Sequence, residues 1–512
     1  MVESPVHGDI EEWNPQAPAA LPAGAPALNV TVRTIEPVSS ISPPPPELAA
    51  GESRRAFGLD ALRGLFLISM TLGFTLGSNH LPLWMYHRQF PFGTETPVDQ
   101  PGISWRDLAY ASFLFTMAAA LPLTLSRRIE KGAVEIDIIT ASLRRYGLLL
   151  VYALLIGHSN TFFLGYTQPA RILSIVGFGL MAMIFTRRRP DWDPKKFAMI
   201  NRAGWALAVV FLALTPLTYG KQFSFDRIDD IIAGLAFASL FGSLIWYFTR
   251  TNLTARLAVL GVCLAAFLGA KGDGWVSQWW WDSPFSWAFS PSRFVLMATV
   301  IPGTIVGDLI LRWMRSSSDQ VAPSWSSARL GGLIALAVAF TPVITVAMYN
   351  RQVQLGTLLA MGMLAGGFFL VADPQTATER LLRSLFLWAT CWMLIGLFVE
   401  PFDGGIRKVP DNLSYYFTVT GTTSMLLVAL VAIVDGLKRQ RWVATLVDVG
   451  HNPLLCYVLF TVFLNPLSEL VPAVRDMSLD NMAVQATRSI IELSLVIAAV
   501  RWMSRRRIYW RT

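Results

Sequence analysis

Apolar segments of about 20 residues recur along most of this 512-residue chain and constrain its fold more than any other feature. A helix of that length spans a hydrocarbon core about 30 Å thick. Fourteen such segments are present, near residues 58–79, 105–126, 143–159, 169–187, 203–219, 230–248, 253–270, 294–314, 329–349, 353–372, 381–399, 413–435, 450–468 and 483–503. The segments 253–270 and 353–372 are the weakest, so we expect 12 to 14 membrane helices.

The composition excludes the main alternatives to a membrane protein. Hydrophobic residues make up 53% of the chain and charged residues 15%, whereas soluble domains carry about 25% charged residues. This balance excludes a soluble globular enzyme, a disordered protein and a fibrous protein. The sequence therefore predicts an all-α, polytopic integral membrane protein whose residues 56–512 form a single transmembrane domain.

The first 55 residues differ from the rest of the chain. They are rich in proline and alanine, include four consecutive prolines at 43–46, and show no apolar periodicity. Such a segment cannot bury a core, so we predict a disordered tail. The segment opens on acidic rather than basic residues and lacks a short apolar stretch, so it does not read as a signal peptide.

The basic residues predict the orientation of the helices. Most of the 42 Lys and Arg residues fall in the tail, the even-numbered loops and the C-terminus, including the clusters at 187–189 and 505–507. The positive-inside rule then places both termini in the cytoplasm. Topology also explains the net charge of +8 without a nucleic-acid partner. The three cysteines form no disulfide or metal-binding pattern, and no metal site is expected.

Three of the five histidines, His80, His87 and His158, map to the outer face, where Asp107 also enters a helix. Histidine titrates near neutral pH and suits a general base. A carboxylate that orients the imidazole would complete the pair. The alternative is structural: the histidines cap helices or contact lipid headgroups, and Asp107 complements a helix dipole.

The cytoplasmic face carries a different cluster. Asp60 and Arg63 stand three residues apart on one helical face, which a structural ion pair explains. Alternatively, arginines on this side bind an anionic ligand, because the guanidinium group suits phosphate. The further arginines on this side are Arg55, Arg127, Arg128, Arg144 and Arg145. Attraction to the inner leaflet explains many of them equally well.

Five tryptophans lie in the outer loop at residues 271–293. Tryptophan favours the membrane–water interface, so an interfacial belt is the simpler interpretation. The alternative is a stacking platform for a sugar or a lipid headgroup.

Four stretches resemble a known family. Residues 55–64 follow the pattern Arg-x-x-x-Leu-Asp-Ala-Leu-Arg-Gly, and residues 84–87 and 102–108 read Trp-Met-Tyr-His and Gly-Ile-Ser-Trp-Arg-Asp-Leu. Residues 404–416 contain Gly-Gly-Ile-Arg-Lys and Leu-Ser-Tyr-Tyr, and residues 449–454 read Val-Gly-His-Asn-Pro-Leu. Together they resemble the membrane acyltransferases related to heparan-α-glucosaminide N-acetyltransferase, across nearly all of residues 55–470. The nearest subgroup is bacterial, which implies the bacterial inner membrane.

The resemblance implies an acyltransferase that uses cytoplasmic acetyl-CoA, with no tightly bound cofactor. The acceptor would be an amine or hydroxyl of a glycan or glycolipid on the other side. His87 best matches the family's catalytic histidine, with Asp107 beside it and His80 in reserve. The donor and acceptor would be bound by Arg55, Asp60, Arg63, Arg144, Arg145 and Asn79. This sequence departs from the family at Phe74, where the family has an asparagine, and Asn79 is the nearest substitute.

Two other classes stay open. The number of spans suits a secondary transporter of a glycan precursor or lipid, although the halves show no convincing repeat. The departure at Phe74 also allows a degenerate family member with a structural role. The sequence leaves the oligomeric state open, a homodimer included.

Overall fold

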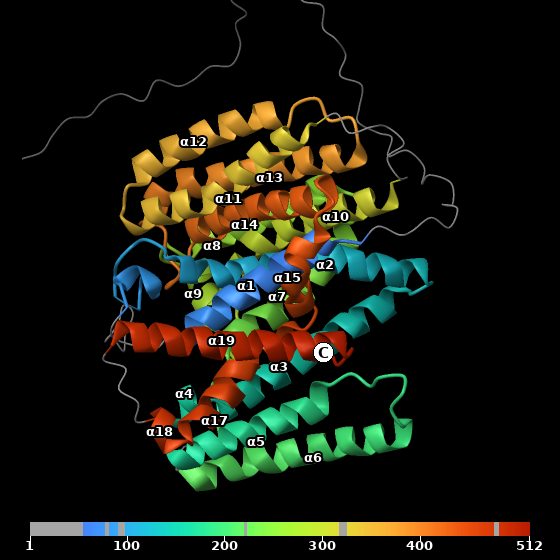
Figure 1. Ribbon diagram of the computed structural model, residues 1–512, viewed down its shortest axis with the longest axis vertical. Coiled ribbons are helices and arrows are strands. Elements are labelled where there is room, and N and C mark those ends of the chain that lie inside the picture. The colour runs from blue at the N-terminus through green and yellow to red at the C-terminus, as the bar shows by residue number, and fades with distance from the viewer. Residues whose placement is uncertain (1–54, 77–80, 91–97, 220–222, 317–324, 476–480) are drawn as a thin grey trace, which may run out of the picture. The chain divides into compact units, whose positions relative to one another are not determined.

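The computed structural model describes residues 55–76, 81–90, 98–219, 223–316, 325–475 and 481–512. The predicted tail, except Arg55, lies outside the described residues, as do Asn79 and His80. The described residues form helices and loops with two isolated β-bridges and no strand, so the all-α prediction is confirmed. The molecule is a polytopic helical membrane protein. Figure 1 shows its helices side by side, from α12 at one end through α1, α2 and α7 to α6 at the other.

The described residues form long and short helices with the following bounds. The long helices are α1 (Phe57–Thr75), α2 (Leu108–Glu130), α3 (Glu135–Ser159), α5 (Gln168–Phe185), α6 (Pro194–Tyr219), α7 (Asp230–Thr249), α8 (Leu253–Gly269), α10 (Met297–Arg315), α11 (Ser327–Tyr349), α12 (Val353–Leu370), α13 (Ala377–Val399), α14 (Leu413–Val431) and α19 (Met482–Arg505). The shorter α-helices are α4 (Thr161–Leu164), α9 (Trp275–Trp281), α15 (Ala444–Gly450), α16 (Pro453–Val458), α17 (Asn465–Glu469) and α18 (Pro472–Arg475). Short 3₁₀-helices, among them η2 (Trp105–Asp107), η3 (Pro291–Leu296) and η4 (Glu400–Asp403), begin or end several of them.

All fourteen predicted segments coincide with helices. Twelve helices among the described residues are long and apolar enough to cross a membrane, and the bent pair from α15 to α17 raises the number to 13. The remaining segment is α8, whose 17 residues rank it with the shorter apolar helices. Its length of about 26 Å falls slightly short of a hydrocarbon core of about 30 Å. The short length of α8 agrees with the weak prediction of a membrane span at residues 253–270.

The predicted span 450–468 begins at a bend and continues as one helical limb, Pro453–Glu469. The chain bends by 74° between Gly450 and Pro453. A proline disfavours helical backbone at the residue before it and suits the first turn of a new helix. Asn452 accordingly leaves the helical region, and Pro453 starts α16.

Contacts between loops sort the helix ends onto two faces. Ion pairs join Arg407 to Asp99 and Lys271 to Asp403 on what we call the His87 face. On the opposite side, the Arg145 face, Arg315 pairs with Glu130. Each pair joins loops that the alternation of 14 segments assigns to one side. The fold therefore supports the predicted alternation, with the start of α1 and the end of α19 on the same face.

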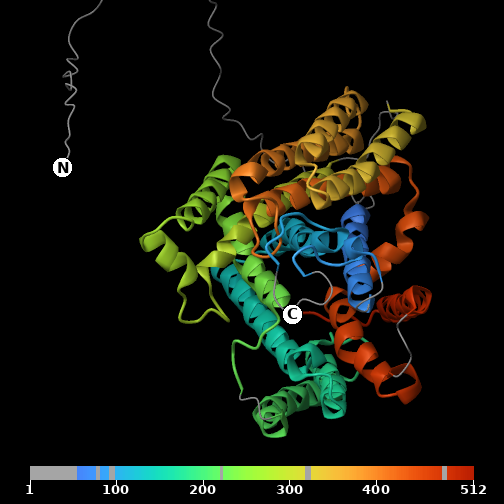
Figure 2. The ribbon, with the colours of Figure 1, turned by 90° about the vertical axis from the view of Figure 1, so that its left-hand side faces the viewer.

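Burial distinguishes the centre of the bundle from its edges. In the apolar 18-residue stretch of the α14 span, 89% of the residues are buried, against 17% in the corresponding stretch of α6. The core around α14 also contains hydroxyl pairs: Ser112 lies 2.6 Å from Thr423 and Thr299 lies 2.8 Å from Thr420, measured between oxygens. Such pairs hold helices together where water is absent. Figure 2 shows the peripheral helices α5 and α6 at one end of the bundle.

Candidate functional site

His87 and Asp107 form a pair on the His87 face. Nδ1 of His87 lies 2.5 Å from Oδ1 of Asp107. The Asp107 side chain is fully buried, while the His87 side chain is 25% exposed. The two residues are 20 positions apart, so the loop between them must fold back for this contact to form. The predicted base–orienter geometry is therefore present in the structure.

The second carboxylate oxygen of Asp107 is occupied by the local backbone. Oδ2 accepts hydrogen bonds from Ser104 N at 2.8 Å, from Ser104 Oγ at 3.0 Å and from Arg88 N at 3.2 Å. The Ser104 contacts form a capping box at the start of η2, which leads into α2. Asp107 thus caps a helix, as the structural interpretation predicts, and also contacts the His87 imidazole.

This arrangement fixes the tautomer of the imidazole. An ionised carboxylate only accepts hydrogen bonds, so Nδ1 of His87 carries the proton that it donates to Asp107. The lone pair of the neutral ring then lies on Nε2, because the side-chain contacts of His87 with described residues, to Asp107 and Lys408, are made by Nδ1. His87 presents a free ring nitrogen as a base or nucleophile.

The loop from Gly404 to Asn412 closes over the pair. Gln89 donates to the carbonyls of Gln100 and Gly102, each at 2.9 Å, and accepts from Lys408 N at 3.3 Å. The Lys408 ammonium then lies 3.5 Å from Nδ1 of His87. The two Lys408 contacts bring residues more than 300 positions apart into one site.

The charges around His87 favour its neutral form. Burial and the Lys408 ammonium lower the pKa of His87 to about 4, although the Asp107 carboxylate opposes this shift. Burial also lowers the pKa of Lys408, against the attraction of Asp107. At neutral pH the imidazole is therefore unprotonated and Nε2 is available.

The other candidate histidines lie elsewhere. His158 is buried at the end of α3, where its Nδ1 contacts the Leu154 carbonyl at 3.0 Å and its ring stacks on Phe223. This position matches the structural interpretation. His451, at the bend after α15, lies 3.4 Å from Asp60 on the Arg145 face.

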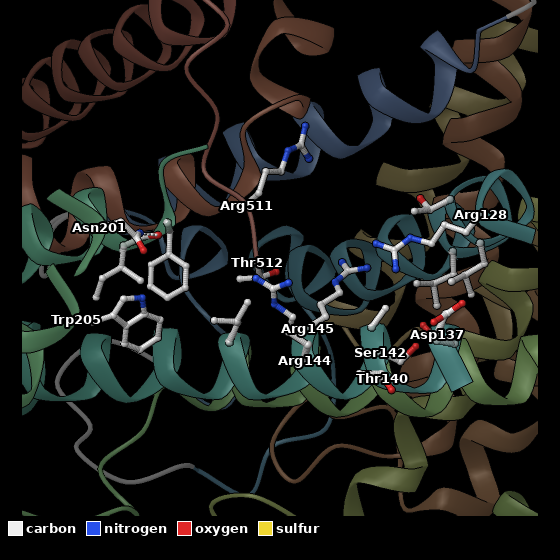
Figure 3. Close-up of a pocket in the computed structure, with 18 of the residues that line it drawn as sticks. Arg128, Asp137, Thr140, Ser142, Arg144, Arg145, Asn201, Trp205, Arg511 and Thr512 are labelled. Atoms are coloured by element: carbon white, nitrogen blue, oxygen red, sulfur yellow. Dashed lines mark hydrogen bonds between the residues drawn. The ribbon is translucent and has the colours of Figure 1, made fainter. Parts of the chain in front are cut away.

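A cavity of about 670 Å³ opens on the Arg145 face between α2, α3, α5 and α6. Its lining includes four arginines, Arg128, Arg144, Arg145 and Arg511, and a single acidic side chain, Asp137. Figure 3 shows Arg144 and Arg145 between Arg128 at one end and Trp205 with Asn201 at the other. We call it the arginine cavity. No carboxylate among the described residues forms an ion pair with these four arginines.

The cavity includes only part of the predicted ligand-binding set. Arg144 and Arg145 line it, whereas Arg55, Asp60 and Arg63 do not. Arg63 instead pairs with Asp60 at 3.2 Å and donates to the Gly450 carbonyl at 3.4 Å. These contacts match the structural interpretation of the Asp60–Arg63 pair.

The close crossing of α1 and α15 brings the Asp60–Arg63 pair next to the end of α15. A Cβ on Gly64 would lie 1.9 Å from the Leu446 carbonyl oxygen, and one on Gly450 would lie 2.0 Å from the Asp60 carbonyl oxygen. Only glycine allows the two backbones to approach this closely.

The last residues of the chain complete the arginine cavity. Arg187 N donates to Tyr509 O at 2.7 Å, and Arg511 N donates to Phe185 O at 2.8 Å. These bonds hold Arg511 against the end of α5. Burial and the neighbouring Arg63 guanidinium lower the pKa of Arg511, while Tyr509 and Asp60 oppose the shift.

Several residues of the two sites could not be predicted as site residues from the sequence. Lys408 belongs to the family-like stretch at 404–416, but nothing in its spacing connects it to His87. Arg511 and Trp205 carry no local motif. Their positions follow from tertiary contacts, so a single sequence offers no signal for them beyond residue type.

The fold and these sites define a polytopic helical membrane protein with a His–Asp pair on one face and an arginine-lined cavity on the other. The chain belongs to the family described as Domain of unknown function (DUF5009), whose model matches residues 55–310. The matched region contains His87, Asp107 and Arg145 but ends before Lys408 and Arg511. No curated protein matches the chain.

Proposed function

We propose that this protein is a transmembrane acyltransferase. It moves an acyl group from acyl-CoA, bound at the Arg145 face, to an amine or hydroxyl of a glycan or glycolipid at the His87 face. The observation that carries the proposal is the His87–Asp107 pair, with a buried orienting carboxylate and a free Nε2. The resemblance of four sequence stretches to membrane acyltransferases supports it.

The chemistry follows from the tautomer. Nε2 of His87 accepts the proton of the acceptor N–H or O–H as that atom attacks the thioester carbonyl. The C–S bond breaks, and the CoA thiolate leaves and takes up the proton. Asp107 stabilises the imidazolium formed between these steps. The products are the acylated acceptor and free CoA thiol.

The arginine cavity supplies a donor site of suitable chemistry. Four guanidinium groups complement the phosphates of CoA, since each offers a fork of donors. The indole of Trp205 provides a flat ring face for a nucleotide base.

The two sites stand at opposite ends of α2. Asp107 and Arg128 lie near its two ends, and 21 residues of helix span about 30 Å. The thioester-bearing arm of the donor must therefore extend between the helices. Exclusion of water there protects the thioester from hydrolysis.

A transporter is the second candidate, because the bend between α15 and α16 is a broken span. The break lies beside Asp60 on the Arg145 face rather than between the two faces. Transporters bind their substrates near the midplane, so this position favours the acyltransferase.

The test uses membranes that contain the protein, radiolabelled acetyl-CoA and a broad glycan and lipid extract. We expect label to enter the extract, CoA thiol to be released, and His87→Gln to lower both rates by about 10²–10⁴-fold. His158→Gln is the matched control, because His158 does not contact the pair. Absence of transfer and of CoA release in the wild type would contradict the proposal. Substrate counterflow in proteoliposomes without CoA release would support the transporter.

A further inference from the structure

A second cavity, of about 350 Å³, lies on the His87 face beside the His–Asp pair. The ends of α2, α7 and α8, the helix α9, the turn η3 and the loop at 408–411 enclose it. Trp280 and Trp281 line it, and we call it the tryptophan cavity. Lys408 also lines it and reaches to 3.5 Å from His87. A ligand in this cavity would therefore lie one side chain away from the imidazole.

Two cations line the tryptophan cavity, and among the described residues neither has a carboxylate oxygen closer than 3.8 Å to its nitrogens. Arg293 approaches Asp230 only to 3.8 Å, and that carboxylate is 91% exposed. The Nη1 atom of Arg293 is buried and has no hydrogen-bond partner among the residues that the structure describes. A buried donor without a partner is costly, so a ligand oxygen at this position would stabilise the cavity.

Lys408 and Asp411 are two further charged residues that line the tryptophan cavity. The Lys408 ammonium approaches His87 at Nδ1, which already donates to Asp107 and cannot accept a second proton. The Asp411 carboxylate accepts the hydroxyl of Tyr416. Burial lowers the pKa of Lys408 and raises the pKa of Asp411. The carboxylates of Asp230 and Asp411 also line the cavity, and an anion bound between Lys408 and Arg293 would offer both cations a further hydrogen-bond acceptor.

Exposed aromatic side chains indicate where the ligand comes from. Trp281 lines the cavity and is also 62% exposed. On the same face, Trp275, Phe285 and Phe402 are exposed as well. Large exposed aromatic residues around the end of a membrane bundle are typical of the headgroup region. The tryptophan cavity therefore opens where lipid headgroups lie.

We propose that the tryptophan cavity binds the phosphate-bearing headgroup of a membrane-anchored glycolipid, through Arg293 and Lys408. That the headgroup is the acyl acceptor rests on the proposed function, whereas its binding does not. The inference narrows the acceptor from glycans in general to a lipid-linked, phosphate-bearing sugar. The same phosphate chemistry is found in free sugar phosphates, so the experiment must separate the two sources.

The experiment measures binding to the full-length protein in dodecyl maltoside micelles, which carry no phosphate. The probes are dodecyl-phosphate-linked glucosamine, dodecyl glucosaminide without the phosphate, and glucosamine 1-phosphate without the chain. Competition against the first probe in radiolabelled form gives each dissociation constant. We expect the first probe to bind at least tenfold tighter than either of the others.

Variants connect the binding to the cavity. Arg293→Gln should weaken binding of the phosphate-linked lipid by about 10–100-fold and leave the neutral lipid unchanged. Arg293→Lys should retain most of the affinity, which separates lost charge from misfolding. Arg488→Gln, which removes an arginine of α19 that pairs with Glu492 outside the cavity, is the matched control.

Different results would overturn the binding inference, the membrane origin of the ligand and its role as acceptor. Equal binding of the phosphate-linked and neutral lipids, or unchanged affinity in a folded Arg293→Gln protein, would overturn the inference. Glucosamine 1-phosphate binding as tightly as the lipid-linked probe would overturn the membrane origin of the ligand. Tight binding of the lipid without acetyl transfer to its amine would keep the binding inference and contradict the claim that this headgroup is the acyl acceptor, whereas the transfer assay with the broad extract tests the acyltransferase itself.

Discussion

The two faces of the bundle treat their charged groups in opposite ways. On the His87 face, Asp107 is saturated by His87, Ser104 and the Arg88 backbone, so its position is fixed before any ligand binds. In the arginine cavity, four guanidinium groups line one space without an ion-pair partner among the described residues. Like charges gathered in this way repel, and an anion would relieve the repulsion. The charge of the first site is hydrogen-bonded within the protein, whereas the arginines of the second form no ion pair among the described residues.

The largest expected effect tests the hydrogen bond between Asp107 and His87. Asp107→Asn keeps the shape of the side chain but removes the charge that fixes the tautomer of His87. We expect the rate of acyl transfer at saturating substrate to fall by about 10²-fold or more. The measurement is transfer of radiolabelled acetyl groups, compared with the wild type and with His158→Gln. A rate within a few-fold of the wild type would show that Asp107 acts only as a helix cap.

The next prediction concerns the arginine cavity. Arg145→Gln removes one unpaired guanidinium, and we expect the KM for acetyl-CoA to rise by about 10–100-fold with little change in kcat. Arg250→Gln is the control, because Arg250 is exposed on the same face and bonds to the Tyr247 carbonyl outside the cavity. A fall in kcat with an unchanged KM would place Arg145 in the chemistry rather than in donor binding.

The sequence could predict the fold well because its signal is local. A membrane helix is recognised from some 20 consecutive apolar residues. The bend at Pro453 was missed because hydropathy does not register a local turn. The His87–Asp107 pair could be predicted from the sequence, because the two residues lie in and at the end of one loop and a carboxylate pairs readily with an imidazole. Lys408 and Arg511 could not, because only the tertiary fold brings them to their sites.

Lys408 offers a finer test of the His87 face. Its ammonium is one of the groups that lower the pKa of His87, together with burial and Arg106, while Asp107 opposes them. In Lys408→Met the pKa of His87 should rise by about one unit or more. Modification of His87 by diethyl pyrocarbonate requires the neutral ring, so its midpoint should move to higher pH. Lys408→Arg should leave the midpoint near that of the wild type, and an unmoved midpoint in Lys408→Met would remove Lys408 from the site's electrostatics.

Protein stability should show the same depressed pKa. The pKa of His87 is about 4 in the folded protein, against an ordinary value of 6.5. The unfolded chain therefore binds a proton at His87 between these values and the folded protein does not. Its contribution to stability is complete above pH 6.5 and is lost as the pH falls towards 4. Thermal unfolding in detergent should show a smaller loss of Tm over this interval for His87→Gln than for the wild type. An identical loss in both proteins would contradict the assignment.

The smallest expected effect separates the two sets of arginines. Arg55 belongs to the family-like stretch that predicted a ligand contact, but its guanidinium lies 5.5 Å from the Phe57 ring and does not line the arginine cavity. Solvent screens an exposed charge outside the cavity, so Arg55→Gln should change the KM for acetyl-CoA by less than about twofold. The same kinetic assay compares it with Arg145→Gln. If Arg55→Gln matched Arg145→Gln, the donor would extend from the cavity to the start of α1, and the distinction between arginines inside and outside the cavity would fail.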